Sequence, residues 1–94
     1  MKASWNGTIV AESDEAIELR GYTYFPRDAV RMDMLRETPK TERDLECPHG
    51  VQFFDVVGDG SVAERAAWSY LAPRPEMEQV DHWVGFWHEV RVES

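Results

Sequence analysis

Cys47 and His49 are the residues of this sequence best suited to covalent chemistry. A cysteine attacks as its thiolate, which a neighbouring histidine can stabilise and generate as a base. The two residues are two positions apart, so their side chains could share one side of a strand end. The simpler interpretation, which we prefer on the sequence alone, makes Cys47 a small apolar residue at a strand end and His49 a turn residue.

Acid–base chemistry would instead use carboxylates on predicted strands, and Glu12, Glu18 and Glu46 are such residues. A glutamate that faces an aromatic cavity resists ionisation and can act as a base. With 18 acidic residues in the chain, triples of this kind arise by chance. The sequence therefore singles out no catalytic residue.

Metal and cofactor sites find little support in the spacing of the possible ligands. Structural zinc sites use closely spaced pairs of Cys and His, whereas His82 and His88 are six positions apart. The stretch Asp55–Gly60 lacks the ligand pattern of a calcium loop, because Val57 occupies a ligand position. Glycine-rich phosphate-binding motifs and the Gly-x-Ser-x-Gly hydrolase motif do not occur. We predict no metal and no cofactor.

Charge and composition restrict the class of partner. The 94 residues carry a formal net charge of −8, which opposes binding to a polyanion. Basic residues concentrate between residues 27 and 43, but acidic residues alternate with them, as on a solvated mixed-charge surface. We expect no nucleic-acid partner.

The single cysteine rules out an internal disulfide and suits a reducing compartment. The first seven residues lack the apolar stretch of a signal peptide, and no window has the ~18 continuous apolar residues needed to span a bilayer. We expect one cytoplasmic domain over residues 1–94, with no membrane contact.

Turn signals divide the chain into short strands. Asn6-Gly7 predicts a hairpin, and Gly21 separates the predicted strands Ile17–Arg20 and Tyr22–Phe25. Pro26 favours a short helix or helical turn over Arg27–Arg36, followed by a mobile loop over Glu37–Arg43.

The second half repeats the pattern of strands and turns. Strands are predicted at Leu45–Cys47 and Val51–Val57, with a tight turn at residues 58–60 and one helical turn at Pro75–Val80. Val62–Tyr70 has features of both helix and strand.

The C-terminal segment alternates between two faces. Under strict alternation Val84, Phe86, Val90 and Val92 face the core, and Trp83 and Trp87 face the other way. Tryptophans on an outer face need cover from another element, a ligand or a partner chain. A bulge or turn near His88 would interrupt this alternation.

The order of several short segments over nearly the whole chain resembles the small bacterial family called domain of unknown function 427. The segments are Trp5-Asn6-Gly7, Ile9–Ser13, Tyr24-Phe25-Pro26, Cys47-Pro48 with Gly50, Phe53–Val56, Ala66–Tyr70 with Pro73 and Pro75, Val84-Gly85-Phe86 and Val90-Arg91-Val92. The resemblance implies a mainly β, compact antiparallel fold of two sheets meeting at an angle, the β-tent arrangement, with one or two short helices. This arrangement is shared with methionine sulfoxide reductases of type B and with zinc domains, whose Cys-x-x-Cys pairs are missing here.

The family also carries a nucleotidyltransferase-like label, but we recognise no motif of that activity in these residues. Members often read Cys-Pro-aromatic-Lys-Gly, whereas this chain has Cys47-Pro48-His49-Gly50 and lacks the lysine. A phosphate contact made by that lysine would be lost here.

Three hypotheses follow. The preferred one is a small organic ligand held in an aromatic-lined pocket between the two sheets. The second is an enzyme that uses Cys47 with His49, or Glu12, in that pocket. The third is an interaction or homodimerisation module built on Trp83 and Trp87. The residues predicted to line the pocket are Trp5, Glu12, Tyr24, Cys47, His49, Trp68 and Tyr70.

Overall fold

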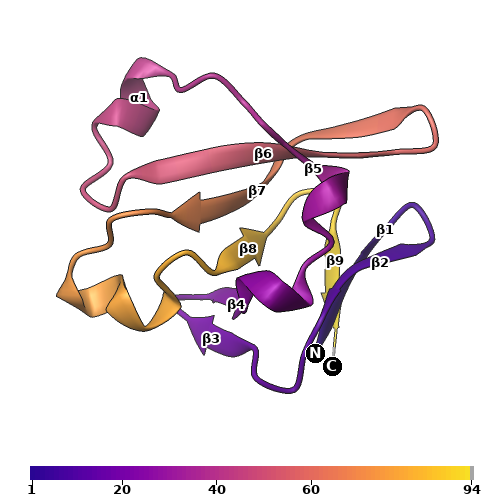
Figure 1. Ribbon diagram of the computed structural model, residues 1–94, viewed down its shortest axis with the longest axis horizontal. Helices are drawn as coiled ribbons and strands as arrows, with labels where there is room; N and C mark the ends of the chain where they lie inside the picture. The colour runs from indigo at the N-terminus through magenta and orange to yellow at the C-terminus, as the bar shows by residue number, and fades with distance from the viewer. Residues whose placement is uncertain (94) are drawn as a thin grey trace.

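Two antiparallel sheets form the structure, a computed structural model that describes residues 1–93 (Figure 1). The smaller sheet has the strand order β2-β1-β9, and the larger has the order β3-β4-β8-β7-β6-β5. The fold is mainly β, as the sequence predicts. The strands are β1 (Lys2–Trp5), β2 (Thr8–Glu12), β3 (Ile17–Leu19), β4 (Tyr22–Phe25), β5 (Leu35–Glu37), β6 (Val51–Gly58), β7 (Ser61–Tyr70), β8 (Val84–Phe86) and β9 (Arg91–Glu93).

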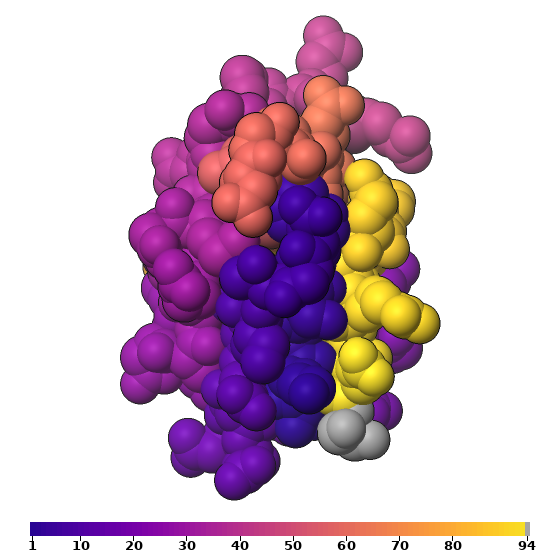
Figure 2. All heavy atoms as spheres, turned by 90° about the vertical axis from the view of Figure 1, so that its right-hand side faces the viewer, coloured from indigo at the N-terminus to yellow at the C-terminus, as the bar shows by residue number. Residues whose placement is uncertain are grey.

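The two sheets cross at a steep angle. In Figure 1 β9 and the β1–β2 hairpin run across the direction of β6 and β7. Figure 2 shows the side of the small sheet, where the N-terminal hairpin lies beside the C-terminal strand and below the tip of the β6–β7 hairpin. Such crossed sheets pack their apolar faces together. We call the face of the large sheet that meets the small sheet its inner face, and the opposite one its outer face.

Each of three hairpin turns consists of a non-glycine residue followed by glycine, and both residues have positive φ. The pairs are Asn6-Gly7, Arg20-Gly21 and Asp59-Gly60. Two such residues make the turn whose twist matches that of the flanking strands. The hairpins predicted at Asn6-Gly7 and around Gly21, and the turn before Ser61, are confirmed.

Helical turns form within Arg27–Arg36, as the sequence predicts, but one continuous short helix does not. Two 3-10 turns, η1 (Arg27–Ala29) and η2 (Met32–Met34), precede β5 instead. Between them Val30 pairs with Ala11, and the Arg31 N–H donates to the carbonyl of Val10 at 2.7 Å. A backbone that bonds to a strand of the small sheet cannot also continue a helix.

The predicted strand Leu45–Cys47 is also wrong, because helix α1 (Glu42–Leu45) occupies this region. Thr41 and Asp44 form a capping box: the Thr41 hydroxyl accepts from the Asp44 N–H, and the Asp44 carboxylate accepts from the Thr41 N–H. This arrangement starts a helix. Glu46 follows the helix and lies on no strand.

The segment before α1 is tied to β6 rather than left as a free loop. Thr38 N–H donates to the Phe53 carbonyl, and Lys40 Nζ donates to the Val51 carbonyl, both at 3.0 Å. Gln52, which is buried, donates to the Thr38 carbonyl at 2.9 Å. These bonds hold the segment that leads into α1 against the first residues of β6.

The remaining sequence features have definite places. Val62–Tyr70 belongs to strand β7, and the helical turn at Pro75–Val80 is confirmed as the 3-10 segment η3. Val84 and Phe86 are buried in the inner core, while the C-terminal strand is interrupted at His88, whose φ is 57°. Consequently β8 belongs to the large sheet and β9 to the small one.

Among residues 1–93, no helix has the length and apolar character required to cross a membrane.

Candidate functional site

Aromatic side chains cover much of the outer face of the large sheet. Tyr22 and Tyr24 on β4, Phe53 on β6, and Trp68 and Tyr70 on β7 come to the same side because side chains alternate along each strand. Met77 and Val80 of η3 are buried against this group. We call the aromatic residues of this face, together with Trp87, the aromatic cluster.

Trp68 is the centre of the aromatic cluster. Its ring lies edge-on to Tyr22, Tyr24 and Trp87, with centroid distances of 5.0, 5.8 and 5.1 Å. It also lies directly over Gly85 of the neighbouring strand, where an added Cβ would stand 2.7 Å from the indole ring. Only glycine allows the ring to approach the sheet this closely, so Gly85 fixes the position of Trp68.

A bulge in β7 brings Arg65 to the edge of the cluster. Between the pairs Phe54–Ala67 and Val56–Ala63, residues 64–66 of β7 face the single residue Asp55 of β6. Arg65 has a φ of 51°, and its N–H donates to Asp55 Oδ1 at 2.9 Å. Bulges of this kind redirect a side chain and are common beside binding sites.

The redirected Arg65 side chain is held on several sides. Its guanidinium lies 4.1 Å from the centre of the Phe53 ring and donates to Asp44 Oδ1 at 2.8 Å. A second donor reaches Thr38 Oγ1 at 3.3 Å. Trp87 is fixed to the same bulge, because its indole N–H donates to the Arg65 carbonyl at 2.6 Å. The bulge thus positions one cation and one ring together.

The acids next to Arg65 are kept ionised. The hydrogen bond from Arg65, above all, lowers the pKa of Asp44 despite its burial. Burial opposes ionisation of Asp55, but hydrogen bonds from the Arg65 N–H and from Arg36 outweigh it and lower the pKa of Asp55. Both carboxylates therefore carry their charge at neutral pH.

A cleft of about 590 Å³ opens on this face, between the aromatic cluster and the segment that carries α1. Its volume is in the range of small-molecule sites. The lining residues are Tyr22, Thr41, Arg43, Asp44, Cys47, Val51, Phe53, Glu64, Arg65, Trp68, Tyr70, Trp87 and His88.

The cleft does not lie between the two sheets, where we expected the pocket from the sequence. That space is filled by packed side chains from both sheets, including Ala3, Val10, Phe25, Phe54 and Phe86. The hollow opens instead on the outer face, between the aromatic cluster and the α1 segment.

Polar groups of the cluster are buried at its base. Burial, above all, and the neighbouring hydroxyl of Tyr70 raise the pKa of Tyr24 far above its ordinary value. The Trp68 indole N–H lies near this phenol but makes no well-formed hydrogen bond with the described residues. An unpartnered buried N–H is uncommon and costs free energy.

Cys47 and His49 do not form a catalytic pair within the described residues. Cys47 lines the cleft, but its thiol has no hydrogen bond to the imidazole. His49 stacks against Tyr70 at 5.0 Å and accepts a hydrogen bond from the Arg74 N–H at its Nδ1, 2.9 Å away. Its Nε2 lies 3.9 Å from Glu76. Both ring nitrogens of His49 therefore face other groups.

The other predicted pocket residues are divided between the two sides of the molecule. Trp68 and Tyr70 line the cleft, and Tyr24 is buried behind them. Trp5 packs against the inner core and lines a separate hollow of about 190 Å³ with Arg31 and Met34. Glu12 is exposed on β2. The structure does not bring Trp5 or Glu12 to the cleft.

Trp83 and Trp87 face the outer side, as the alternation predicts, but neither is fully exposed. Trp87 stacks on Phe53 at 5.9 Å and lines the cleft. Trp83 packs against the aromatic cluster. Their cover is supplied largely by the chain itself.

Within residues 1–93, no three His, Cys, Asp or Glu side chains are grouped so that they could hold a metal ion. Cys47, His49, His82 and His88, the possible ligands in the sequence, belong to different surroundings: Cys47 and His88 line the cleft, and His49 and His82 bond elsewhere.

Sequence reasoning missed Arg65, Asp44 and Phe53 as site residues. The Thr41-x-x-Asp44 spacing of a capping box was a usable signal for α1 and for the buried carboxylate. The mixed helix and strand character of residues 62–70 predicted neither the bulge in β7 nor the direction of Arg65.

No curated protein matches the sequence. The model of one family matches residues 1–94, the whole chain. The chain belongs to this family, described as a domain of unknown function, DUF427.

Proposed function

We propose that this protein binds a small organic molecule in the aromatic-lined cleft on the outer face of its large sheet. The observation that carries the proposal is the composition of the cleft: five aromatic rings surround a hollow of about 590 Å³ that also contains the Arg65–Asp44 ion pair. Apolar walls with a few fixed polar groups are typical of small-molecule sites.

The local backbone supports a binding role. The β7 bulge, the positive φ of Arg65 and the close approach of Trp68 to Gly85 all cost free energy or restrict the sequence. Together they fix the positions of one guanidinium and two indole rings. A site that is rigid before its ligand arrives loses less entropy on binding.

The two alternative functions have weaker support. A Cys47 nucleophile would need a base, and His49 faces Arg74 and Glu76 instead. A homodimer through Trp83 and Trp87 would need these rings exposed, and both are half-buried. As part of the proposal we place the protein in the cytoplasm, because one unpaired cysteine suits a reducing compartment.

The experiment is a thermal-shift screen of uncharged, acidic and basic aromatic compounds, followed by alkylation of Cys47. A compound at about a hundred times its dissociation constant adds roughly 2.7 kcal/mol of stability. Cys47 is the only cysteine, so the rate of its alkylation reports on the cleft alone.

We expect compounds that raise the melting temperature to slow alkylation of Cys47. Denatured protein serves as the control, in which the same compounds leave the rate unchanged. Stabilising compounds that leave the alkylation rate of the folded protein unchanged would contradict binding in this cleft.

A further inference from the structure

The charges around the cleft differ from those of the chain as a whole. The chain has a formal net charge of −8, yet two arginines and two acids line the cleft, Arg43 and Arg65 against Asp44 and Glu64. A ligand that enters the cleft therefore meets a local environment without the excess negative charge of the remaining surface.

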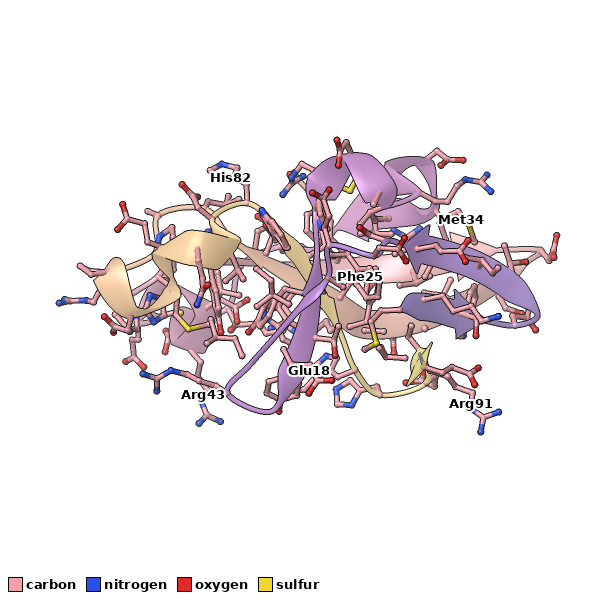
Figure 3. The ribbon with its side chains drawn as sticks, turned by 90° about the horizontal axis from the view of Figure 1, so that it is seen from below. Glu18, Phe25, Met34, Arg43, His82 and Arg91 are labelled. Carbon is pink, nitrogen blue, oxygen red and sulfur yellow. The ribbon has the colours of Figure 1, made fainter. Side chains whose placement is uncertain are left out.

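Most of the unused hydrogen-bonding groups in the cleft are donors. Asp44 already accepts from Arg65 through Oδ1 and from the Thr41 N–H through Oδ2. The other acid, Glu64, is exposed at the rim. By contrast, Arg43 has no ion pair within residues 1–93, and Figure 3 shows its side chain pointing outward, at the end of the molecule opposite Arg91.

Arg65 is fixed in place and still has donors to offer. A guanidinium has five N–H donors, and the bonds to Asp44 and Thr38 use one each. About a third of the side chain is exposed, and it lies between the cleft and a second hollow of about 440 Å³ that includes Thr38 and Asp55. An anionic group could therefore reach Arg65 without displacing Asp44.

The aromatic rings continue directly from this cation. Arg65 covers one face of Phe53, Phe53 stacks on Trp87, and Trp87 meets Trp68 edge to face. An acid bound at Arg65 places its attached ring beside these indoles. Arginine is well suited to bind the planar oxygens of carboxylates and phosphates.

We infer that the ligand is a planar ring that carries one anionic group, with the acid at Arg65, Arg43 at the rim, and the ring among Phe53, Trp68 and Trp87. This inference rests on the proposed function and specifies its ligand class. A cationic ligand is disfavoured because two arginines line the cleft and the buried carboxylate is already paired.

The test uses four probes with one ring: 2-naphthoate, 2-naphthyl phosphate, 2-naphthamide and 2-naphthylmethylammonium. Calorimetry measures each dissociation constant at low salt. We expect at least one of the two anions to bind about tenfold or more tightly than the amide, because a charge-assisted hydrogen bond exceeds a neutral one by this order. The order of the two anions distinguishes a carboxylate ligand from a phosphate ligand.

Variants locate the anionic group. Arg65→Lys keeps the charge but loses the planar fork, and we expect the tighter anion to weaken about tenfold while the amide is unchanged. Arg43→Gln should weaken the anion by about threefold, as expected for an exposed charge at a rim. Arg91→Gln, at the opposite end of the molecule, is the matched control and should change nothing.

The possible outcomes separate the two proposals. If the amide or the ammonium probe binds as tightly as both anions and protects Cys47 from alkylation, the ligand class is wrong and the cleft still binds small molecules. An anion preference that survives in Arg65→Lys and Arg43→Gln would also overturn the inference. If none of the four probes protects Cys47, the ligand class is wrong, and the thermal-shift screen with alkylation then decides separately whether the cleft binds another small molecule.

Discussion

The inner and outer faces of the large sheet contain different kinds of residue and are closed to different extents. The inner face packs against the small sheet with Phe25, Val56 and Val84, each fully buried. The outer face carries rings with polar ends, an ion pair and a cleft, and η3 covers only part of it. In a sheet with two occupied faces, one can stabilise the fold while the other remains available for binding.

The comparison extends to charge. The buried cluster of the inner face consists of apolar residues, whereas Asp44 and Arg65 stand at the edge of the outer one. Figure 3 shows Phe25 near the middle of the molecule and Arg43 at its periphery. We therefore expect substitutions inside the inner core to affect stability most, and substitutions around the cleft to affect pH dependence and binding.

The largest expected effect is the loss of a ring from the inner core. Phe25 is fully buried and packs edge-on to Phe86 at 5.9 Å. Phe25→Ala should lower the free energy of unfolding by about 3–5 kcal/mol, measured by urea denaturation. The matched variant Tyr22→Ala, on the outer face and 41% exposed, should cost only about 1 kcal/mol. Equal losses would show that the two faces do not differ in this way.

A methyl group at residue 85 should strain the outer face. Gly85→Ala would place its Cβ 2.7 Å from the Trp68 indole, closer than van der Waals contact. We therefore expect the ring to be displaced and the free energy of unfolding to fall by about 1–3 kcal/mol. Replacing Trp68 by Leu in the same chain removes the obstructing atoms. In the Trp68→Leu background, the additional cost of Gly85→Ala should largely disappear. A cost that stays the same in both backgrounds would mean that the contact does not determine the strain.

The buried carboxylate of Asp44, on the outer face, should make the stability of the fold depend on pH in the acidic range. The pKa of Asp44 is lowered in the folded protein, so its ionised form stabilises the fold above the pKa of the unfolded chain. That stabilisation is lost as the pH falls through the folded-state pKa. Asp44→Asn should cost about 1–3 kcal/mol at pH 7, and the difference from the wild type should shrink as the pH falls below the pKa of an aspartate in the unfolded chain.

Urea midpoints at pH 7 and pH 3 measure this effect. Asp33→Asn provides the comparison: Arg31 also lowers the pKa of Asp33, but this pair is exposed to solvent, so its pH-dependent difference should be smaller. A gap between Asp44→Asn and the wild type that is independent of pH would contradict the role of the Asp44 charge.

The smallest expected effect concerns Cys47. The thiol lines the cleft without a hydrogen bond to His49, so Cys47→Ser should change the free energy of unfolding by less than about 1 kcal/mol. A compound found by the thermal-shift screen should still bind the variant with little change in affinity. A complete loss of binding would give the cysteine a direct part in the site, as the enzyme hypothesis requires.

Much of the fold could be predicted because local signals agree with tertiary structure. Asn6-Gly7 and Asp59-Gly60 adopt the positive φ values that their turns demand, and Val84 and Phe86 alternate as the two occupied faces require. Where long-range bonds decided the conformation, the prediction was only partly right. Residues 27–36 favour a helix locally, but the Val30–Ala11 pairing prevents one.

The candidate site was harder to predict, because its position depends on which faces of the strands meet. Tyr24, Cys47, Trp68 and Tyr70 come together near one cleft, whereas Trp5 points into the other side. Alternation along a strand predicts which side chains share a face. It does not predict which of the two faces another element covers. Arg65 reaches the cleft only through a bulge in β7, which shifts the register locally.

The most direct test of the central claim is a two-dimensional ¹H–¹⁵N spectrum of the indole N–H groups during titration with a stabilising compound. The four tryptophans give four such signals, and two of them, from Trp68 and Trp87, belong to rings that line the cleft. Binding in the cleft predicts that these two signals move with a common dissociation constant, while the Trp5 signal, from the opposite side of the sheet, stays in place. Movement of the Trp5 signal with Trp68 and Trp87 unchanged would contradict the account.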